Sequence, residues 1–575
     1  MKRLRKPDLL DDEFEDLLKH SAEEESVITS KDSIPAKGLS GLSTHQQNLP
    51  TWELAESGNI LSISNMTAPE AGSNASTQLS SIMARLISLL QSYKCESSNV
   101  IFSTLLLRSM SDFTTINPIY GAHFTKPIPP SRVTVACGSS LPEGIEVVLS
   151  VTVSKSNARR GLHVQSRSYW APANIGPYSQ AVTVPINNLL KEAQDRPIWD
   201  SPQIVYVAGQ IPLVPASMEI VKADTEQTTP GELEGFKTQT VLALQHLWRI
   251  GRVMNVGWWT GGVAFISHCS SDEGSKRAKL AAEAWRAIHL KLKPNLNSED
   301  EDAEEQGNDV DVWHTKHGGF SGSEGVETDQ RPALPDYDRV NGGGEGAIPP
   351  CFTAQVQELP RAADIEWTSV GLAKASVSVM NTTGTPSIHV TGVLDTSSSF
   401  VFVGIEDVKD LLGLEKAIRE AHEWESVSWT LQTYDDTPQA AFDDLIGSFP
   451  DGGPGSQPLQ GDKGDHFYVT KMTRALAAEV AKNPIVKYMA ENDREDGSDA
   501  RGHIYSEDDP EKIQRLSASV ENQYVVYTSQ ALPTEWLEDI EIKKQIIPCQ
   551  RVWDENGHEL AAVVVVRRNT EDLRD

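Results

Sequence analysis

The sequence predicts an α+β protein in which β-sheets carry helices on one face and the same order of elements occurs more than once. Apolar residues at 79, 82, 83, 86 and 90 have the spacing of an amphipathic helix between two strand-like runs. The order β-α-β-α-β-β over residues 50–154 recurs over residues 168–373. A repeat of this size indicates tandem copies of a domain and not a solenoid.

The first copy is the more regular of the two. Strands are expected at 59–64, 100–107, 132–137 and 146–153, and helices at 79–90 and 112–124. The run at 100–107 is mostly apolar, which is typical of a buried strand.

The second copy has the same elements, separated by a long insertion. Strands are expected at 203–210, 258–268, 351–359 and 364–372, and helices around 236–247 and 276–292. Residues 293–347 are acidic, poor in aliphatic side chains and rich in glycine, so we expect a disordered insertion there.

The two ends of the chain are less regular. Residues 1–49 are polar and are expected to form a disordered linker, with a short amphipathic helix around Asp11–His20. Residues 385–575 predict an α+β domain. The expected elements are strands at 388–392, 400–404, 427–434, 524–528 and 560–567, helices at 408–422 and 470–481, and a loop at 447–466.

Two interpretations of residues 385–575 stay open: a degenerate third copy with a loop insertion, or a separate domain. A third copy would let one chain close its own threefold ring as an intrachain pseudo-trimer. Two copies would leave the ring open and recruit other chains.

Composition limits the classes of partner. The formal net charge of −30 opposes contact with nucleic acid and with anionic membranes. No run reaches the roughly 18 apolar residues of a membrane span. The five cysteines are far apart and form no CxxC motif, which argues against a disulfide framework and a structural zinc site. We therefore expect a soluble cytoplasmic protein without a membrane or nucleic-acid partner.

Several motifs resemble those of the RidA (YjgF) family. The segment SDFTTINPIYGAHF at 111–124 is similar to the family's DFxxxNxxYxxFF helix, and PSRVTV at 130–135 to its PARxxV strand. APANIGPYSQA at 171–181 is close to the family's opening motif, and AGQIP at 208–212 to its SGQIP strand. The resemblance implies chorismate-mutase-like modules, each a β-sheet with helices packed on one face.

The arrangement of the copies is similar to the C-terminal region of the long eukaryotic diphthine–ammonia ligases. The closing segment PCQRVWD at 548–554, followed by ELAAVV at 559–564, adds to this resemblance. It implies a role in the last, amidation step of diphthamide synthesis, with elongation factor 2 as the partner.

In that family an N-terminal ATP-pyrophosphatase domain binds ATP through an SGGxDS loop, whose glycines let backbone N–H groups approach phosphate. The sequence has no such motif. No cofactor and no metal is therefore expected in this chain, and ATP and magnesium are expected only through a separate ATP-pyrophosphatase domain. The chain could be a truncated ligase or a genuine split protein.

The RidA resemblance also implies site residues. In that family an arginine binds the carboxylate of a 2-imino acid, and a glutamate positions water or moves a proton. The arginine matches Arg132 in the first copy, where the glutamate position holds Val148. The glutamate matches Glu366 in the second copy, where the arginine position holds Cys351.

The resemblance further assigns substrate-binding positions to Tyr178, Asn117 and Cys351. Because neither copy keeps both Arg132 and Glu366, we expect little or no hydrolysis of imines. Two alternatives stay open for this pair. Arg132 and Glu366 face each other across a module interface, or Arg132 is a surface or salt-bridged arginine and Glu366 a solvated strand residue.

Three functions follow from these observations, and whether the chain is itself an enzyme stays open among them. The first is the scaffold or substrate-recognition part of a diphthine–ammonia ligase. The second is a stand-alone deaminase of the 2-iminobutanoate/2-iminopropanoate type. The third is a non-catalytic interaction module.

Overall fold

The structure is a computed structural model of the whole chain. It describes residues 9–24, 49, 52–186, 197–222, 232–291, 333–341, 347–382, 386–394, 396, 398–422, 427–433, 457–460, 466–472, 521–539 and 542–569. No helix within these ranges is long and apolar enough to cross a membrane.

The first sheet has five strands, with two helices against one of its faces. Its strands lie in the order β1-β2-β5-β3-β4, and β3 and β4 are parallel. Leu79, Ile82 and Leu86 of the first helix are fully buried against the sheet. The elements are β1 (Glu53–Ser57), β2 (Ile60–Met66), α2 (Ala75–Ser92), β3 (Val100–Leu107), α3 (Phe113–Gly121), β4 (Ser131–Ala136) and β5 (Val147–Ser154).

The second sheet has eight strands and two long helices. Its central strands lie in the order β7-β8-β14-β11-β13, with β6 at one edge and β23 and β24 at the other. The elements are β6 (Arg160–Leu162), β7 (Ala181–Pro185), β8 (Gln203–Val207), α4 (Glu232–Val253), β11 (Val256–Ile266), α5 (Ser271–Lys291), β13 (Cys351–Gln355), β14 (Ile365–Ala373), β23 (Arg551–Trp553) and β24 (Glu559–Leu560). A two-strand hairpin, β9 (Leu213–Val214) and β10 (Glu219–Ile220), follows β8.

The third sheet has seven strands and carries shorter helices. Its strands lie in the order β12-β15-β16-β17-β25-β21-β22. The elements are β12 (Val340–Asn341), β15 (Val377–Thr382), β16 (Ser387–Val393), β17 (Ser398–Ile405), α7 (Leu414–His422), β21 (Glu521–Thr528), α12 (Thr534–Glu538), β22 (Lys543–Pro548) and β25 (Ala562–Asn569).

The three sheets share one strand order. If five strands of each sheet are numbered along the chain, they lie side by side as first, second, fifth, third and fourth. These are β1-β2-β5-β3-β4, β7-β8-β14-β11-β13 and β16-β17-β25-β21-β22. The third and fourth strands are parallel in every case. A common connectivity of this kind places equivalent positions of the three sheets in equivalent surroundings.

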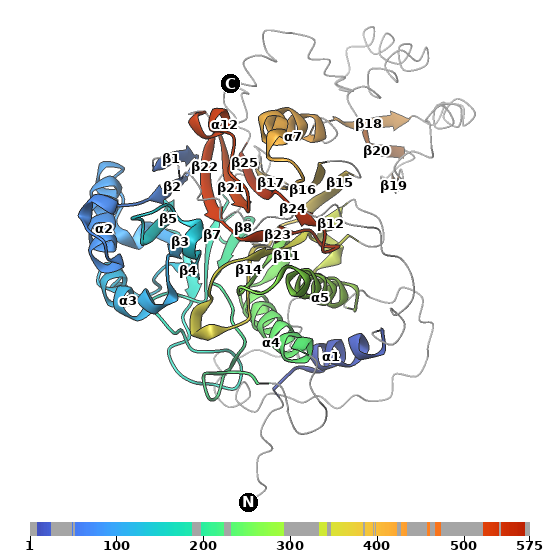
Figure 1. Cartoon of the computed structure of the whole chain (residues 1–575). Helices are drawn as coiled ribbons and strands as arrows, with labels where there is room; N and C mark the ends of the chain where they lie inside the picture. Colours follow the sequence, from blue (N-terminus) through green and yellow to red (C-terminus); the bar gives the residue numbers. More distant parts are fainter. Residues whose placement is uncertain are drawn as a thin grey trace, which may run out of the picture.

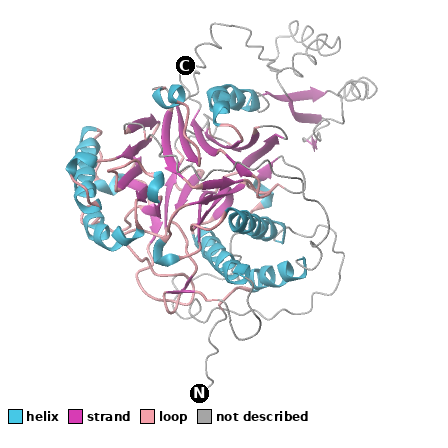
Figure 2. Cartoon of the chain, viewed as in Figure 1, coloured by secondary structure: helices cyan, strands magenta, loops and turns pink. Residues whose placement is uncertain are grey.

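The sheets gather in the middle of the molecule and the helices lie outside them. Figure 1 shows α2 and α3 on one side, α4 and α5 on a second, and α7 and α12 on a third. Figure 2 shows the strands of these three sheets together at the centre. One apolar cluster joins side chains of all three sheets, among them Val133, Phe265 and Tyr527. The faces opposite the helices therefore form a shared core.

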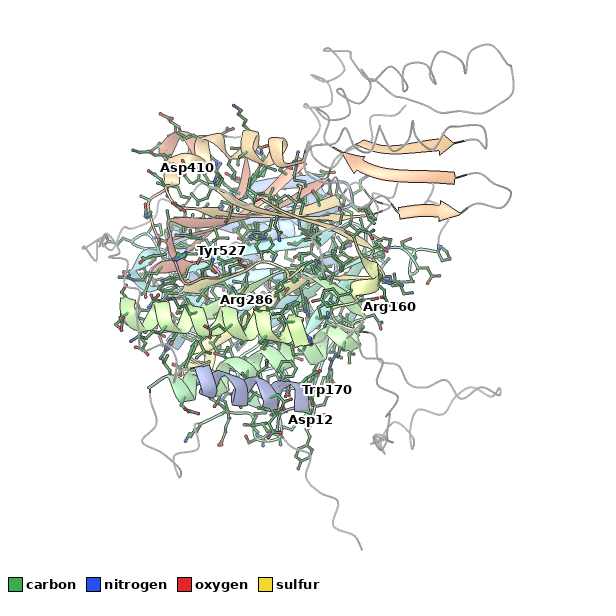
Figure 3. The ribbon with its side chains drawn as sticks, turned by 90° about the vertical axis from the view of Figure 1, so that its right-hand side faces the viewer. Asp12, Arg160, Trp170, Arg286, Asp410 and Tyr527 are labelled. Atoms are coloured by element: carbon green, nitrogen blue, oxygen red, sulfur yellow. The ribbon has the colours of Figure 1, made fainter. Side chains whose placement is uncertain are left out.

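The short helix expected around Asp11–His20 is present as α1 (Asp12–Glu24), whereas two expectations about other poorly patterned segments are wrong. Figure 3 shows α1 beneath the long helices of the second sheet. Phe14 is fully buried there, with its ring centroid 6.4 Å from that of Trp248. Asp11 also accepts hydrogen bonds from Arg249 at 2.8 and 2.5 Å, so burial and charge together hold α1 in place.

The end of the expected insertion is also ordered: Leu334 is buried and its carbonyl accepts a hydrogen bond from the Trp248 indole at 3.1 Å. Residues expected to form a loop and a helix near 457–472 instead pair as strands. These are β19 (Gln457–Gln460) and β20 (His466–Met472), which join β18 (Val427–Thr433) in a small sheet. The rest of the insertion and residues 473–481 lie outside the described residues.

Candidate functional site between the first and second sheets

Arg132 lies on β4, at the edge of the first sheet that meets the second. Only 3% of the residue is exposed. Its carbonyl accepts a hydrogen bond from the N–H of Gly209, just beyond β8, at 3.2 Å. The neighbouring Ser131 forms a parallel bridge with Ser179. The backbone of the second sheet therefore holds Arg132 directly at the junction.

Aromatic side chains surround the Arg132 guanidinium. Its central carbon lies 4.9 Å from the ring centroid of Tyr120, 5.0 Å from that of Tyr178 and 5.6 Å from that of Phe113. Such contacts stabilise a cation that has lost water. Nη2 donates to Oδ1 of Asn117 at 2.8 Å, but Nη1 is buried and has no hydrogen-bond partner. One N–H group of a fixed cation is therefore free to bind an anion.

Glu366 lies on β14 of the second sheet, opposite Phe265 of β11. It is 2% exposed, and its Oε2 atom is buried without a hydrogen-bond partner. A carboxylate in such a position would lose its hydration with no replacement, which favours the protonated form. Burial accordingly raises the pKa of Glu366 to about 8, against the smaller opposing effect of Arg132.

Gly209 is the residue at which Arg132 and Glu366 meet. A Cβ atom at this position would lie 1.5 Å from Oε1 of Glu366, so the carboxyl group occupies the space of the missing side chain. The same glycine donates its N–H to the carbonyl of Arg132. Burial lowers the pKa of Arg132, and Tyr120, Tyr178 and, least of the three, Glu366 oppose this shift. The Arg132 backbone and the Glu366 carboxyl group therefore meet at Gly209 across the junction, and these two residues together are called the composite site.

Tyr178 completes the wall of this site. It is 8% exposed, and burial raises the pKa of its hydroxyl to about 12, with Arg132 opposing the shift. Gly176 approaches Arg132 closely, because a Cβ atom there would lie 2.7 Å from Nη2. The site thus combines a cation, a neutral carboxyl group and a neutral phenol in one buried space. Together they can bind a carboxylate and supply a proton to a leaving group.

Most of the residues proposed from the sequence meet here. Arg132, Glu366, Tyr178 and Asn117 belong to one site, and the interpretation of Arg132 and Glu366 as exposed residues is wrong. Cys351 is not part of it. Its thiol lies in another cavity, of about 100 Å³, which it shares with Ser387, His389 and Val563.

Strand register explains why Cys351 is elsewhere. Arg132 is paired with Ser103, Cys351 with Gly262 and Lys544 with Tyr524, each across the parallel third and fourth strands of its sheet. These are equivalent positions in the three sheets.

On the third strand of each sheet, the residue three positions further along pairs with the antiparallel fifth strand. Its partner there is Val148 in the first sheet, Glu366 in the second and Val563 in the third. The glutamate position is therefore occupied by a carboxylate in the second sheet alone.

The other two junctions have different chemistry. Between the second and third sheets, Cys351 and Val563 line one cavity without a charged pair at these positions. Between the third and first sheets, Nζ of Lys544 lies 3.3 Å from Oε1 of Glu53, and the Lys544 carbonyl accepts from Asn65 at 2.8 Å. An internal ion pair thus occupies that junction. Among the described residues of the three junctions, an arginine and a glutamate with unpaired polar atoms occur only at the first.

Sequence reasoning missed the residues that shape the site without taking part in chemistry. Phe113 and Tyr120 lie in the helix motif, four residues before and three residues after Asn117. This spacing puts them on the same helical face as Asn117, and it is the signal that would have found them. Gly176 and Gly209 also lie in recognised motifs, but their role depends on contacts between two sheets. Within the described residues, no group of three His, Cys, Asp or Glu side chains could hold a metal ion.

Comparison with known proteins identifies a family domain in the part of the chain that forms the first sheet. Residues 55–154 match the endoribonuclease L-PSP family. This L-PSP domain spans β1 to β5 and contributes Arg132 and Asn117 to the site. Glu366 and Tyr178 lie outside the matched segment.

Longer relatives share more of the chain. The diphthine–ammonia ligase of Schizosaccharomyces pombe is 33% identical over 227 residues, which is 39% of this chain and 32% of that protein. The diphthine–ammonia ligase of Saccharomyces cerevisiae is 36% identical over 215 residues, which is 35% of this chain and 28% of that protein. The matched part spans about a third of the length of these curated relatives.

A solved structure of a YjgF family member from Neisseria meningitidis matches 18% of this chain and 87% of that chain. The identity is 24% and the TM-score is 0.17.

The raised pKa of Glu366 predicts a pH-dependent stability. The unfolded carboxyl titrates near 4.5 and the folded one near 8, so the folded state binds the extra proton between these values. The contribution of protonated Glu366 to the free energy of unfolding is complete below pH 4.5. It is lost as the pH rises to 8, which lowers the free energy of unfolding by roughly 5 kcal/mol at most. Glu366→Gln removes this titration. Its unfolding free energy, measured by urea with tryptophan fluorescence, should therefore rise relative to the wild type between pH 5 and 8.

The exposed glutamate Glu219 provides the matched control. Glu219→Gln should show a constant difference from the wild type over the same pH range. A constant difference for Glu366→Gln as well would show that Glu366 is ionised in the folded protein at neutral pH.

Proposed function

We propose that the chain acts in diphthamide synthesis as the RidA-like part of a diphthine–ammonia ligase. The observation that carries this proposal is the identity of 33% and 36% to the two yeast ligases over more than 200 residues each. Elongation factor 2, which carries diphthine, is then the protein partner. ATP and magnesium are bound by a separate ATP-pyrophosphatase domain, because the SGGxDS motif is absent from the sequence.

The three sheets are, in this proposal, three copies of one module that form a pseudo-trimer within a single chain. Their common strand order and the position of the helices outside the sheets support it. The third copy, after about residue 385, is the degenerate one, since its helix α12 has five residues. One chain would then form all three module junctions, including the one with Arg132 and Glu366.

A second candidate function is the hydrolysis of 2-imino acids, and the composite site is the observation that favours it. The Arg132 guanidinium would bind the substrate carboxylate. Water would add to the C=N bond, and the protonated Glu366 would supply the proton with which ammonia leaves as the C–N bond breaks. The products are a 2-oxo acid and ammonia. Ammonia is also the nitrogen donor named in the relatives' activity.

Expression in cells that lack diphthine–ammonia ligase tests the first proposal. The chain alone should not restore diphthamide, because the SGGxDS motif is absent from its sequence. Expressed with the ATP-pyrophosphatase domain of a yeast ligase as a separate chain, it should restore diphthamide on elongation factor 2, detected by mass spectrometry. Failure of the pair, when the full yeast ligase succeeds in the same cells, would contradict the proposed role.

Release of ammonia from freshly generated 2-aminoacrylate tests the second candidate. The separation of Arg132 and Glu366 in the sequence predicts little or no hydrolysis, whereas their meeting at Gly209 predicts that the purified chain exceeds the uncatalysed rate. Arg132→Met should lose about a hundredfold or more of that excess, since a charge-assisted contact is removed. Lys544→Met, at the equivalent position of another junction, is the matched control and should keep the activity per folded molecule. If the wild-type protein releases ammonia only at the uncatalysed rate, the site does not catalyse this hydrolysis and the second candidate function is contradicted.

A further inference from the structure

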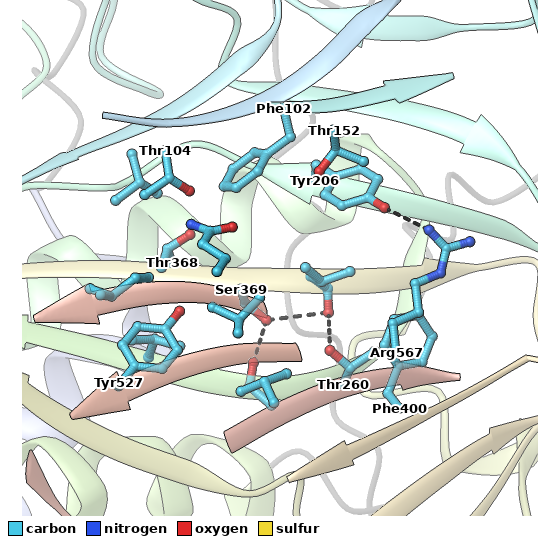
Figure 4. A pocket seen from close by; sticks show the side chains of 18 of the residues that line it. Phe102, Thr104, Thr152, Tyr206, Thr260, Thr368, Ser369, Phe400, Tyr527 and Arg567 are labelled. Carbon is cyan, nitrogen blue, oxygen red and sulfur yellow. Dashed lines mark hydrogen bonds between the residues drawn. The ribbon is translucent and has the colours of Figure 1, made fainter. Parts of the chain in front are cut away.

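A further cavity lies where the three sheets meet, apart from the junction that holds Arg132 and Glu366. It is a cavity of about 130 Å³, lined by side chains from each sheet. Phe102 and Thr104 come from the first sheet, Tyr206 and Thr368 from the second, and Tyr527 from the third. Figure 4 shows these side chains around the open space, with Arg567 beside Tyr206 at one end.

Among the described residues that line this cavity, Arg567 is the one with a charged side chain. Its Nη1 atom donates to the hydroxyl of Tyr206 at 3.2 Å, and its Nε atom is buried without a hydrogen-bond partner. No carboxylate lies within salt-bridge distance of Arg567 in the described part of the chain. A half-buried guanidinium without a counter-ion favours the entry of an anion.

The neutral polar groups of the wall divide into two sets. The hydroxyls of Thr260, Thr368 and Ser369 already donate to backbone carbonyls at 3.1, 3.1 and 2.7 Å. A second set has no hydrogen-bond partner among the described residues and could bind a guest. It consists of Thr104, Thr152, Gln523, Gln545 and Tyr527.

Aromatic rings supply the apolar part of the wall. Phe102 and Tyr206 are stacked with ring centroids 5.6 Å apart, and Phe400 also lines the space. The cavity is similar in size to one of about 150 Å³ that holds benzene in another protein. A guest with roughly five to eight non-hydrogen atoms would therefore fit.

We propose that this axial cavity binds a small monocarboxylate with a short apolar body, whose carboxylate lies against Arg567. The aromatic rings and valines would contact the body, while the free hydroxyl and amide groups would bind the second carboxylate oxygen. The proposal is independent of the function of the Arg132 site, because it rests on different side chains and on another space.

Butyrate is the probe, with 1-butanol as its neutral analogue. Saturation-transfer NMR at pH 7 should show that butyrate binds to the full chain. The affinity for 1-butanol should be lower by about tenfold or more, because the alcohol lacks the charge-assisted contact. This comparison uses the wild-type protein and does not depend on the folding of a variant. Equal binding of the two compounds would overturn the proposal, and so would the absence of butyrate binding at about 50 mM.

Two variants locate the binding, since butyrate could also occupy the Arg132 site. Arg567→Met should weaken butyrate about tenfold or more, whereas Arg132→Met should leave the axial component unchanged. Thermal unfolding would verify that both variants are folded. Loss of butyrate binding in Arg132→Met with full retention in Arg567→Met would assign the binding to the junction and refute the axial site.

Discussion

The buried pair of Arg132 and Glu366 is the interaction on which the account of this protein depends. A guanidinium and a carboxyl group, both almost fully buried and each with an unpaired polar atom, are costly to keep in a folded protein. The cost is reduced by the aromatic rings around Arg132 and by protonation of Glu366. Such an arrangement is typical of a site that binds a ligand, because the ligand satisfies the groups that the fold leaves free.

The same constraint explains how the three junctions differ. At one position of the fourth strand, the first, second and third sheets have arginine, cysteine and lysine. At one position of the fifth strand, they have valine, glutamate and valine. The lysine junction is satisfied internally by Glu53, and the cysteine junction has no charge to satisfy at these positions. Different side chains at equivalent strand positions of the three sheets therefore place the arginine and the glutamate at one junction.

Much of this could be predicted from the sequence where local pattern determines structure. The helix stripe of Leu79 to Leu90 and the apolar strand at 100–107 were correctly placed, and the motifs identified Arg132 and Glu366. Their meeting across a module interface was one of two alternatives that the sequence left open, because it depends on Gly209 and on the packing of two sheets that are separate in the sequence. The docking of α1 was missed, since its polar flanks conceal that Phe14 is buried under Trp248. The strand at His466–Met472 was taken in part as a helix, because short apolar runs do not distinguish the two.

The central claim is that one chain supplies both halves of the Arg132–Glu366 site through an intrachain threefold core. Light scattering on the purified chain, coupled to size exclusion, tests this most directly. The account predicts the mass of one chain, 63.0 kDa, over a wide range of protein concentration. A stable trimer at the same concentrations would contradict it, because the modules would then pair between chains and the composite site would be shared among them.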